Sequence, residues 1–122
     1  LRMELGEKPV LTRGLDGCLF VYPNRDWQLF SEKINNLPLG QKKARDFKRF
    51  MLSGASEIEI DEMGRILIPD PLKKYAKLGK SIVVIGVQDR IELWDENIWS
   101  KYIAESEKLS GDIAEGLNEF GI

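Results

Sequence analysis

The stretch that decides the fold occurs twice, once as GLDGCLFVYPNRDW (residues 14–27) and again as GVQDRIELWDENIW (residues 86–99). An offset of 72 residues aligns the two copies without a gap. The matched positions are Gly14 with Gly86, Leu15 with Val87, Leu19 with Ile91, Val21 with Leu93, Tyr22 with Trp94 and Trp27 with Trp99, and upstream Val10 and Leu11 with Ile82 and Val83. Self-similarity at a fixed period indicates one supersecondary unit that is used twice.

Each copy has the pattern of a β-hairpin. Runs of apolar and β-branched residues predict first strands over residues 10–13 and 81–87, and return strands over 18–22 and 90–94. The turns fall at Asp16-Gly17 and Gln88-Asp89, and Asp-Gly is among the stronger hairpin signals. In the second return strand Glu92 alternates with Ile91 and Leu93, which predicts that they lie on opposite faces.

A helix is expected after each hairpin. Large apolar residues recur at helical spacing, at Trp27, Phe30, Ile34 and Leu37 in the first copy and at Ile98, Trp99, Tyr102 and Ile103 in the second. Asn24 or Asp26 could cap the first helix and Asp95 the second, because such side chains accept hydrogen bonds from first-turn amides. The spacing favours Trp27, Trp94 and Trp99 as core or interface residues over a role in stacking on bases.

Between the copies, residues 40–52 predict a further helix, which Gly54 ends. Its apolar face carries Ala44, Phe47, Phe50 and Met51, and its other faces carry Lys42, Lys43, Arg45, Lys48 and Arg49 against the single acid Asp46. Two interpretations stay open for these cations: a solvated face of a core helix, or a basic binding surface.

A second hairpin is predicted over residues 58–69, with Glu62-Met63-Gly64 at the turn and Gly64 available for a positive φ. Glu57 and Glu59 alternate with isoleucines, so they are expected to be solvated rather than an acid–base pair. Pro69 stops the return strand. A short helix follows over residues 70–78, and Gly79 closes it.

The repeat also predicts how the chain is divided. Shifted back by 72 residues, the counterpart of the 58–69 hairpin would precede Leu1, and residues 1–5 would match the end of the short helix near residues 72–76. We therefore expect a full product that begins roughly a hairpin earlier. The expected units are a first repeat over 1–52, a second over 53–108 and an acidic C-terminal tail over 109–122.

Composition narrows the possible functions. The 122 residues suffice for one ordinary domain or two very small ones, with a net charge of −2, no histidine and the single cysteine Cys18. Lack of histidine makes a zinc cluster or a histidine-activated nucleophile improbable, and Cys18 is expected to be a small core residue. One cysteine and no apolar run of membrane length fit a cytoplasmic protein. No metal, cofactor, small-molecule ligand or membrane contact is expected, nor an enzyme, since no nucleophile–base set or glycine-rich phosphate loop is present.

The sharpest chemical motif is Asp61-Glu62-Met63-Gly64-Arg65. The acid and the arginine flank a tight turn, so both can lie at the tip of a hairpin. A guanidinium there could contact phosphates or pair with the O6 and N7 atoms of guanine in the major groove, while Asp61 orients it. The alternative is a purely structural Asp–Arg pair at a turn, and spacing alone leaves both open.

Several segments resemble MraZ proteins in order and spacing. These are LTRGLDGCLFVYPNRDW, FMLSGASEIEID, DEMGRILIP, PLKKYAKL and IVVIGVQDRIELWDENIW, which together cover the chain up to about Glu107. MraZ proteins carry two Asp-x-x-x-Arg copies, each in a swapped-hairpin unit, whereas this chain holds only the copy at Asp61 and Arg65. The resemblance implies an α+β fold with a mostly β core and flanking helices, in which two repeats form an AbrB-like swapped-hairpin barrel.

The same resemblance implies a sequence-specific DNA-binding repressor that is nucleoid-associated. It implies a ring-shaped homo-oligomer that binds repeated promoter sites upstream of the division and cell-wall gene cluster. Asp61 and Arg65 would be DNA-binding residues, with Gly64 needed for turn geometry. Lys73 and Lys74 do not follow from the resemblance, but they are candidate phosphate contacts. The alternative is that they are exposed charges on a helix.

Three other functions are possible for a chain of this sequence. The same fold could serve as an oligomeric scaffold or an antitoxin-like protein-interaction module, to which the acidic stretch from Glu105 onward would be suited. A hydrolase is disfavoured by the absence of catalytic groups, and RNA binding by the absence of an aromatic sheet signature.

Overall fold

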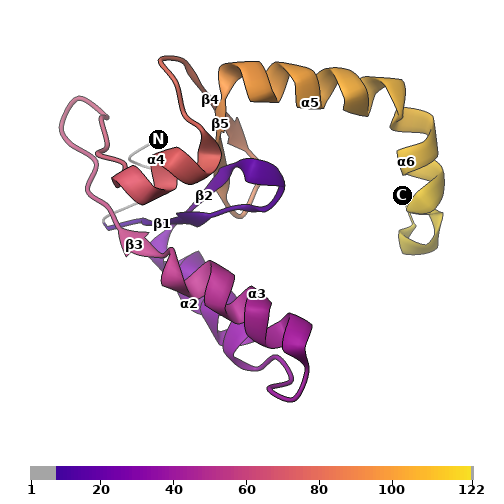
Figure 1. The fold of residues 1–122 in the computed structure, drawn as a ribbon, viewed down its shortest axis with the longest axis horizontal. Helices are drawn as coiled ribbons and strands as arrows, with labels where there is room; N and C mark the ends of the chain where they lie inside the picture. The colour runs from indigo at the N-terminus through magenta and orange to yellow at the C-terminus, as the bar shows by residue number, and fades with distance from the viewer. Residues whose placement is uncertain (1–7, 122) are drawn as a thin grey trace.

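A computed structural model describes residues 8–121 of the chain and gives a mixed α+β fold built on one antiparallel sheet (Figure 1). The strands are β1 (Val10–Arg13), β2 (Leu19–Tyr22), β3 (Ser56–Glu57), β4 (Ile82–Gly86) and β5 (Ile91–Asp95). The helices are α2 (Asn24–Asn35), α3 (Lys42–Ser53), α4 (Asp70–Ala76), α5 (Glu96–Lys108) and α6 (Ser110–Gly116), with short 3-10 turns η1 (Leu15–Gly17) and η2 (Asn118–Phe120). The α+β class predicted from the sequence is thereby confirmed.

The strand order is β3-β1-β2-β5-β4, so β3 and β4 form two edges and the sheet is open within residues 8–121. The closed barrel implied by the resemblance is therefore not observed in this part of the chain. Both hairpins of the repeat are present, β1 with β2 and β4 with β5. They join because the two return strands, β2 and β5, pair with each other.

The central pairing relates the two copies by an approximate two-fold axis. Phe20 lies opposite Glu92, and Leu19 lies opposite Leu93 while Val21 lies opposite Ile91. Since Leu19 corresponds to Ile91 and Val21 to Leu93 in the repeat, each copy makes the same contact with the other. The predicted equivalence of the return strands at an offset of 72 is therefore consistent with the pairing.

The gapless alignment of the first strands was wrong by one residue. Val10 lies opposite Tyr22, but it is Val83, not Ile82, that lies opposite the equivalent Trp94. The offset is therefore 73 in the first strands and 72 in the return strands. The cause is the turn, because five residues separate the last paired positions Arg13 and Leu19 whereas four separate Gly86 and Ile91.

Each face of the sheet buries its own apolar cluster. One face, covered by α4, buries Leu11, Leu19, Val21, Ile58, Ile60, Ile68, Leu72, Ala76, Ile91 and Leu93. The other, covered by α2, α3 and α5, buries Cys18, Phe20, Tyr22, Ile34, Met51 and Trp94, with Trp27 and Trp99 partly buried beside them. The predicted core roles of Cys18 and Trp94 are confirmed, and burial raises the pKa of the Cys18 thiol to about 12.

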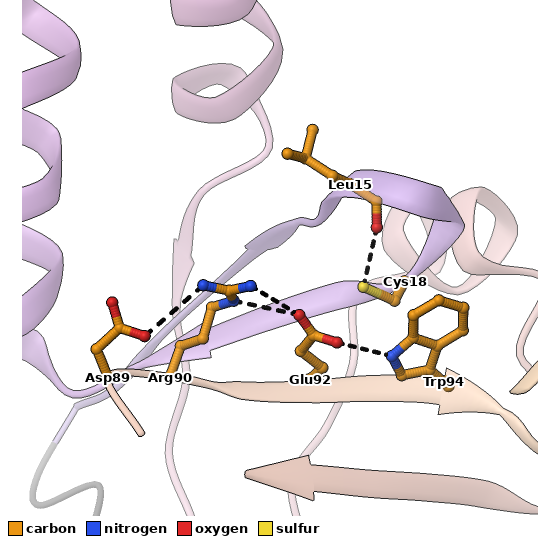
Figure 2. Close-up of polar contacts among 6 residues, drawn as sticks. All are labelled: Leu15, Cys18, Asp89, Arg90, Glu92 and Trp94. Carbon is orange, nitrogen blue, oxygen red and sulfur yellow. Dashed lines mark hydrogen bonds and ion pairs between the residues drawn. The ribbon is translucent and has the colours of Figure 1, made fainter. Parts of the chain in front are cut away.

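A polar network lies within the second face (Figure 2). Arg90 donates to Glu92 at 2.9 Å, and its guanidinium carbon lies 4.1 Å from the centre of the Phe20 ring. Glu92 accepts a second hydrogen bond from the indole nitrogen of Trp94 at 3.0 Å. The Glu92 side chain therefore lies on the other face of the sheet from Ile91 and Leu93, as the alternation predicted. Its charge is compensated by Arg90 and Trp94 rather than by solvent.

Two local predictions need correction, and a third is confirmed. Helix α2 takes Pro23 as its N-cap, so neither Asn24 nor Asp26 caps it, whereas Asp95 does cap α5 by accepting from the Ile98 amide. Helix α4 ends at Ala76 because Lys77 adopts the left-handed conformation, before Gly79 is reached.

The 58–69 segment forms a turn rather than a two-stranded ladder. Within residues 8–121 only the Ile60–Ile66 bridge is formed there, because the segment leaves the sheet after β3 and no strand of the described part lies beside it. Burial of Ile58, Ile60 and Ile68 holds it in place. The expectation about residues 1–5 lies outside the described residues.

Helix α4 is fastened to the first hairpin by one hydrogen bond. The Tyr75 hydroxyl donates to the Gly14 carbonyl oxygen at 2.6 Å, and its ring packs edge-on against Phe50. We expect Tyr75→Phe to lower the free energy of unfolding by about 1 kcal/mol, because the ring contact is kept and a partly buried carbonyl loses its donor. Urea denaturation measures this, and Tyr102→Phe is the matched control, because Tyr102 on α5 also packs its ring against an aromatic side chain but is 41% exposed. Equal midpoints for the two variants would contradict the expected role of the hydroxyl.

Candidate nucleic-acid interface

Residues 61–65 close a tight turn at the end of the 58–69 segment. The Asp61 amide donates to the Arg65 carbonyl at 2.9 Å, and the Gly64 amide donates to the Asp61 carbonyl at 3.0 Å. One carboxylate oxygen of Asp61, Oδ1, also accepts from the amides of Met63 and Arg65, at 2.9 and 2.8 Å. A short acidic side chain folding back on turn amides is the reason this sequence turns here.

The second carboxylate oxygen of Asp61 orients the arginine. Oδ2 accepts from Arg65 Nε at 3.0 Å, while Nη2 lies 3.4 Å from Met63 Sδ. The Arg65 side chain is 73% exposed, so its position is set by these contacts rather than by burial. Because Asp61 accepts from Nε and Met63 Sδ accepts one hydrogen bond from Nη2, Nη1 and the second N–H of Nη2 form the edge that an external acceptor could meet. The predicted Asp61–Arg65 pair is therefore present, and its geometry is compatible with both the structural and the binding interpretation.

Gly64 supplies the backbone conformation that the turn requires. Its φ is +79°, in the left-handed region that side chains with a Cβ disfavour. A Cβ added there would contact nothing within 4 Å, so any cost of substitution comes from the backbone and not from a clash.

The two predicted lysines lie on α4, and both are exposed. Lys73 lines a hollow with Leu67, Ile68, Pro69 and Asp70. A neighbouring hollow is lined by Glu59, Ile60, Asp61, Arg65, Ile66 and Leu67. Leu67 borders both, so the structure brings Lys73 to the flank of the tip, whereas Lys74 lies beside it on α4 without lining that hollow.

Two apolar side chains at the tip were not singled out from the sequence. Met63 is 76% exposed and Leu67 is 84% exposed. Exposed apolar groups beside a cation suit contact with the methyl group of thymine in the major groove. The signal for Leu67 was available, since it alternates with Ile66 and Ile68 and must face away from the core that buries Ile68. Met63 gave no such signal, because a turn has no periodicity.

Charge around the tip is divided between two neighbouring segments. Residues 61–65 hold two acids and one arginine, a formal charge of −1. Residues 70–80 hold Asp70 against Lys73, Lys74, Lys77 and Lys80, a formal charge of +3. Attraction to a polyanion would thus come from α4 and the loop after it, while the tip offers one oriented guanidinium.

Other chemistries find little support in the described part of the chain. Residues 8–121 contain no group of three or more side chains placed to hold a metal ion. Glu57 and Glu59 are both exposed, as expected. Over the same residues no helix combines the length and the apolar character needed to cross a bilayer.

The positive φ at position 64 is testable. We expect Gly64→Ala to lower the free energy of unfolding by about 1 kcal/mol, the cost of placing a Cβ in a left-handed conformation. Gly40→Ala is the control, since Gly40 is exposed, has open space around its Cβ position and lacks a positive φ. Thermal denaturation of both variants measures the difference, and a Gly64→Ala protein as stable as the control would show that the turn adopts another conformation.

Comparison with known proteins identifies the family. The family model described as "MraZ protein, putative antitoxin-like" matches residues 1–50 and 51–117. A protein of Caldanaerobacter subterraneus subsp. tengcongensis named "Transcriptional regulator MraZ" is 49% identical over 121 residues, which are 99% of this chain and 85% of that protein. Proteins of the same name from Halothermothrix orenii and Natranaerobius thermophilus are each 48% identical over the same shares. With family-model matches in both halves and near half identity over almost its whole length, this chain belongs to the MraZ family of transcriptional regulators.

Proposed function

We propose that this protein is a sequence-specific DNA-binding repressor that reads the major groove with the Asp61–Arg65 tip. The observation that carries the proposal is the orientation of the exposed Arg65 guanidinium by Asp61 Oδ2 at 3.0 Å. A planar donor held in one orientation suits the paired acceptors of guanine. Its relatives' name, transcriptional regulator, supports the same class of function.

Phosphate contacts would come from α4. Lys73 flanks the tip and Lys74 lies next to it, and both are exposed cations. Contacts of this kind add affinity that falls as salt rises, because bound phosphates release their counterions. Arg65 would then discriminate between DNA sequences, and Gly64 would maintain the turn that presents it. The lysines would supply attraction to DNA that does not depend on its sequence.

Several copies would act together. One tip makes too few contacts for a stable complex, so we propose a ring of identical subunits that binds repeated sites in the promoter of the division and cell-wall gene cluster. Joining weak contacts in one assembly raises the effective concentration of each further tip. Repression would follow from covering promoter DNA. Such a protein would act without catalysis, cofactor or metal, at the nucleoid.

The swapped-hairpin barrel and the division into units belong to the same proposal. The hairpins β1–β2 and β4–β5, related by the axis through Phe20 and Glu92, would be the interleaved halves of that barrel. The units would be residues 1–52 and 53–108, followed by the acidic tail 109–122. The two separate matches of the family model, over 1–50 and 51–117, support a division near residue 50.

A scaffold or antitoxin-like module is the second candidate. Two observations favour it: the words of the family description, and the formal charge of −1 on residues 61–65. An acidic tip meeting a protein partner would not need to overcome repulsion from phosphates. Selective binding of promoter DNA separates the two candidates.

The proposal predicts the effect of losing the guanidinium. We expect Arg65→Ala to weaken binding to the division-cluster promoter by about 1–3 kcal/mol, the value of one bidentate base contact, and to reduce discrimination against a scrambled duplex. Gel shifts at two salt concentrations measure both quantities. Arg65→Lys should retain the charge yet lose discrimination, because a lysine cannot make the two parallel hydrogen bonds.

Arg25→Ala is the matched control, since Arg25 is an exposed arginine on α2. Unchanged affinity and selectivity in Arg65→Ala would exclude base reading by the tip. No selective binding by the unaltered protein would favour the interaction module instead.

A further inference from the structure

The C-terminal segment, α6 with η2, is amphipathic, and within residues 8–121 its apolar face is exposed. Leu109, Ile113, Leu117 and Phe120 recur every three or four residues over α6 and η2, and all four are exposed, Phe120 at 67%. Asp112, Glu115 and Glu119 recur on an adjacent face. A short helix whose apolar side chains meet water gains little from folding alone, so this face is expected to bury itself against another surface.

The segment lies at the end of an arm. Helix α5 leaves the sheet, and α6 turns at its far end, well away from α2 and α3, which project from another side of the sheet (Figure 1). Helix α5 contacts the sheet through its first half, where Trp99 and Tyr102 pack against Trp94. The arm therefore presents α6 outward, in a position to meet a neighbouring molecule.

A groove of complementary character lies on α3. Leu39 and Leu52 line it together with Arg45, Lys48 and Arg49, and Leu39 is 74% exposed. The groove is preformed, because Arg45 donates to the Leu39 carbonyl at 3.0 Å and Lys48 donates to Asn35 Oδ1 on α2 at 2.8 Å. It therefore combines leucine side chains with three cations, of which Arg45 and Lys48 are held by these hydrogen bonds and Arg49 lies 3.6 Å from Asp46 on the same helix.

Leu39 and Leu52 distinguish between a nucleic acid and an amphipathic protein helix as the occupant of the groove. A nucleic acid could pair its phosphates with the three cations but would leave Leu39 and Leu52 without apolar contact. An acidic amphipathic helix satisfies both, since its leucine and isoleucine side chains can cover the floor while its carboxylates meet the cations. The C-terminal segment of this same chain has that composition, and the arm keeps it away from its own α3.

We propose that α6 of one copy docks into the α3 groove of the next copy, with residues Leu109, Ile113 and Leu117 over the leucines and Glu115 and Glu119 facing Lys48 and Arg49. Such a contact joins two different surfaces, so it propagates from copy to copy and closes into a ring when the rotation allows. This inference rests on the proposed function in one respect, because it identifies the contact that would join the copies of the proposed ring. It does not depend on the Asp61–Arg65 tip.

Charge reversal on either side tests the contact. Lys48→Glu/Arg49→Glu makes the groove acidic, and Glu115→Lys/Glu119→Lys makes the helix basic. We expect each variant alone to raise the dissociation constant between copies at least about tenfold, because like charges then face each other. Equal amounts of the two variants should reassemble, since the acidic helix of one fits the unaltered groove of the other and the basic helix fits the acidic groove. Sedimentation velocity without DNA measures the species present.

Arg25→Glu/Lys80→Glu is the control, with the same charge change on exposed residues outside the groove. Assembly should be unchanged in this variant. The inference is overturned if the unaltered protein is monomeric at micromolar concentration, if the reversed variants assemble normally, or if their mixture fails to reassemble. Promoter gel shifts report on the proposed function separately, so an assembled protein without selective DNA binding would refute that function and leave the contact standing.

Discussion

The fold depends on the antiparallel pairing of β2 with β5, which joins the two copies of the repeat into one sheet. That pairing places Phe20 opposite Glu92, an arrangement that would strand a carboxylate in an apolar layer. Arg90 resolves it by donating to Glu92 while its guanidinium lies against the Phe20 ring, and Trp94 supplies a further donor. Removing one partner from such a network leaves a partly buried charge uncompensated, which costs more than the network contributes when intact. The centre of the sheet is thus held by polar contacts that exist in one copy only, since the first copy has Cys18 where the second has Arg90.

Much of this architecture could be predicted from the sequence, and the failures have physical causes. The hairpins were predictable because Asp16-Gly17 marks a turn and the strands alternate or are wholly apolar. The one-residue difference between the first strands was not, because the alignment of two hairpins without a gap hides whether a loop has four or five residues. The 58–69 segment was predicted as a ladder from alternation alone, yet alternation reports only which side chains are buried. Backbone pairing needs a neighbouring strand, and residues beyond β3 have none in the described part of the sheet.

The candidate site was predicted in its residues but not in its geometry. Asp61, Gly64 and Arg65 could be named because the spacing of an acid, a glycine and an arginine is typical of a hairpin tip. Sequence could not tell which edge of the guanidinium Asp61 would engage, and that choice decides what remains available. Engagement of Nε leaves most of the Nη edge for the acceptor that the proposed function requires, and it would lower the conformational entropy lost in such binding. The ion pair itself, exposed to solvent, contributes little to stability. Its value lies in orientation, which reconciles the structural and binding interpretations.

The two copies of the repeat are followed by helices of opposite charge. The helices after the two hairpins, α2 and α5, are equivalents in the repeat, with Trp27 matching Trp99. Their continuations differ: α2 is followed by a basic helix, α3, and α5 by an acidic one, α6. A perfectly repeated chain would present the same surface twice and could pair only with itself. The opposite charges of α3 and α6 make the two surfaces different, because two α3 helices or two α6 helices would repel each other whereas α3 and α6 would attract. If copies assemble through the proposed contact, this divergence in charge between the two continuations would set the direction in which one copy joins the next.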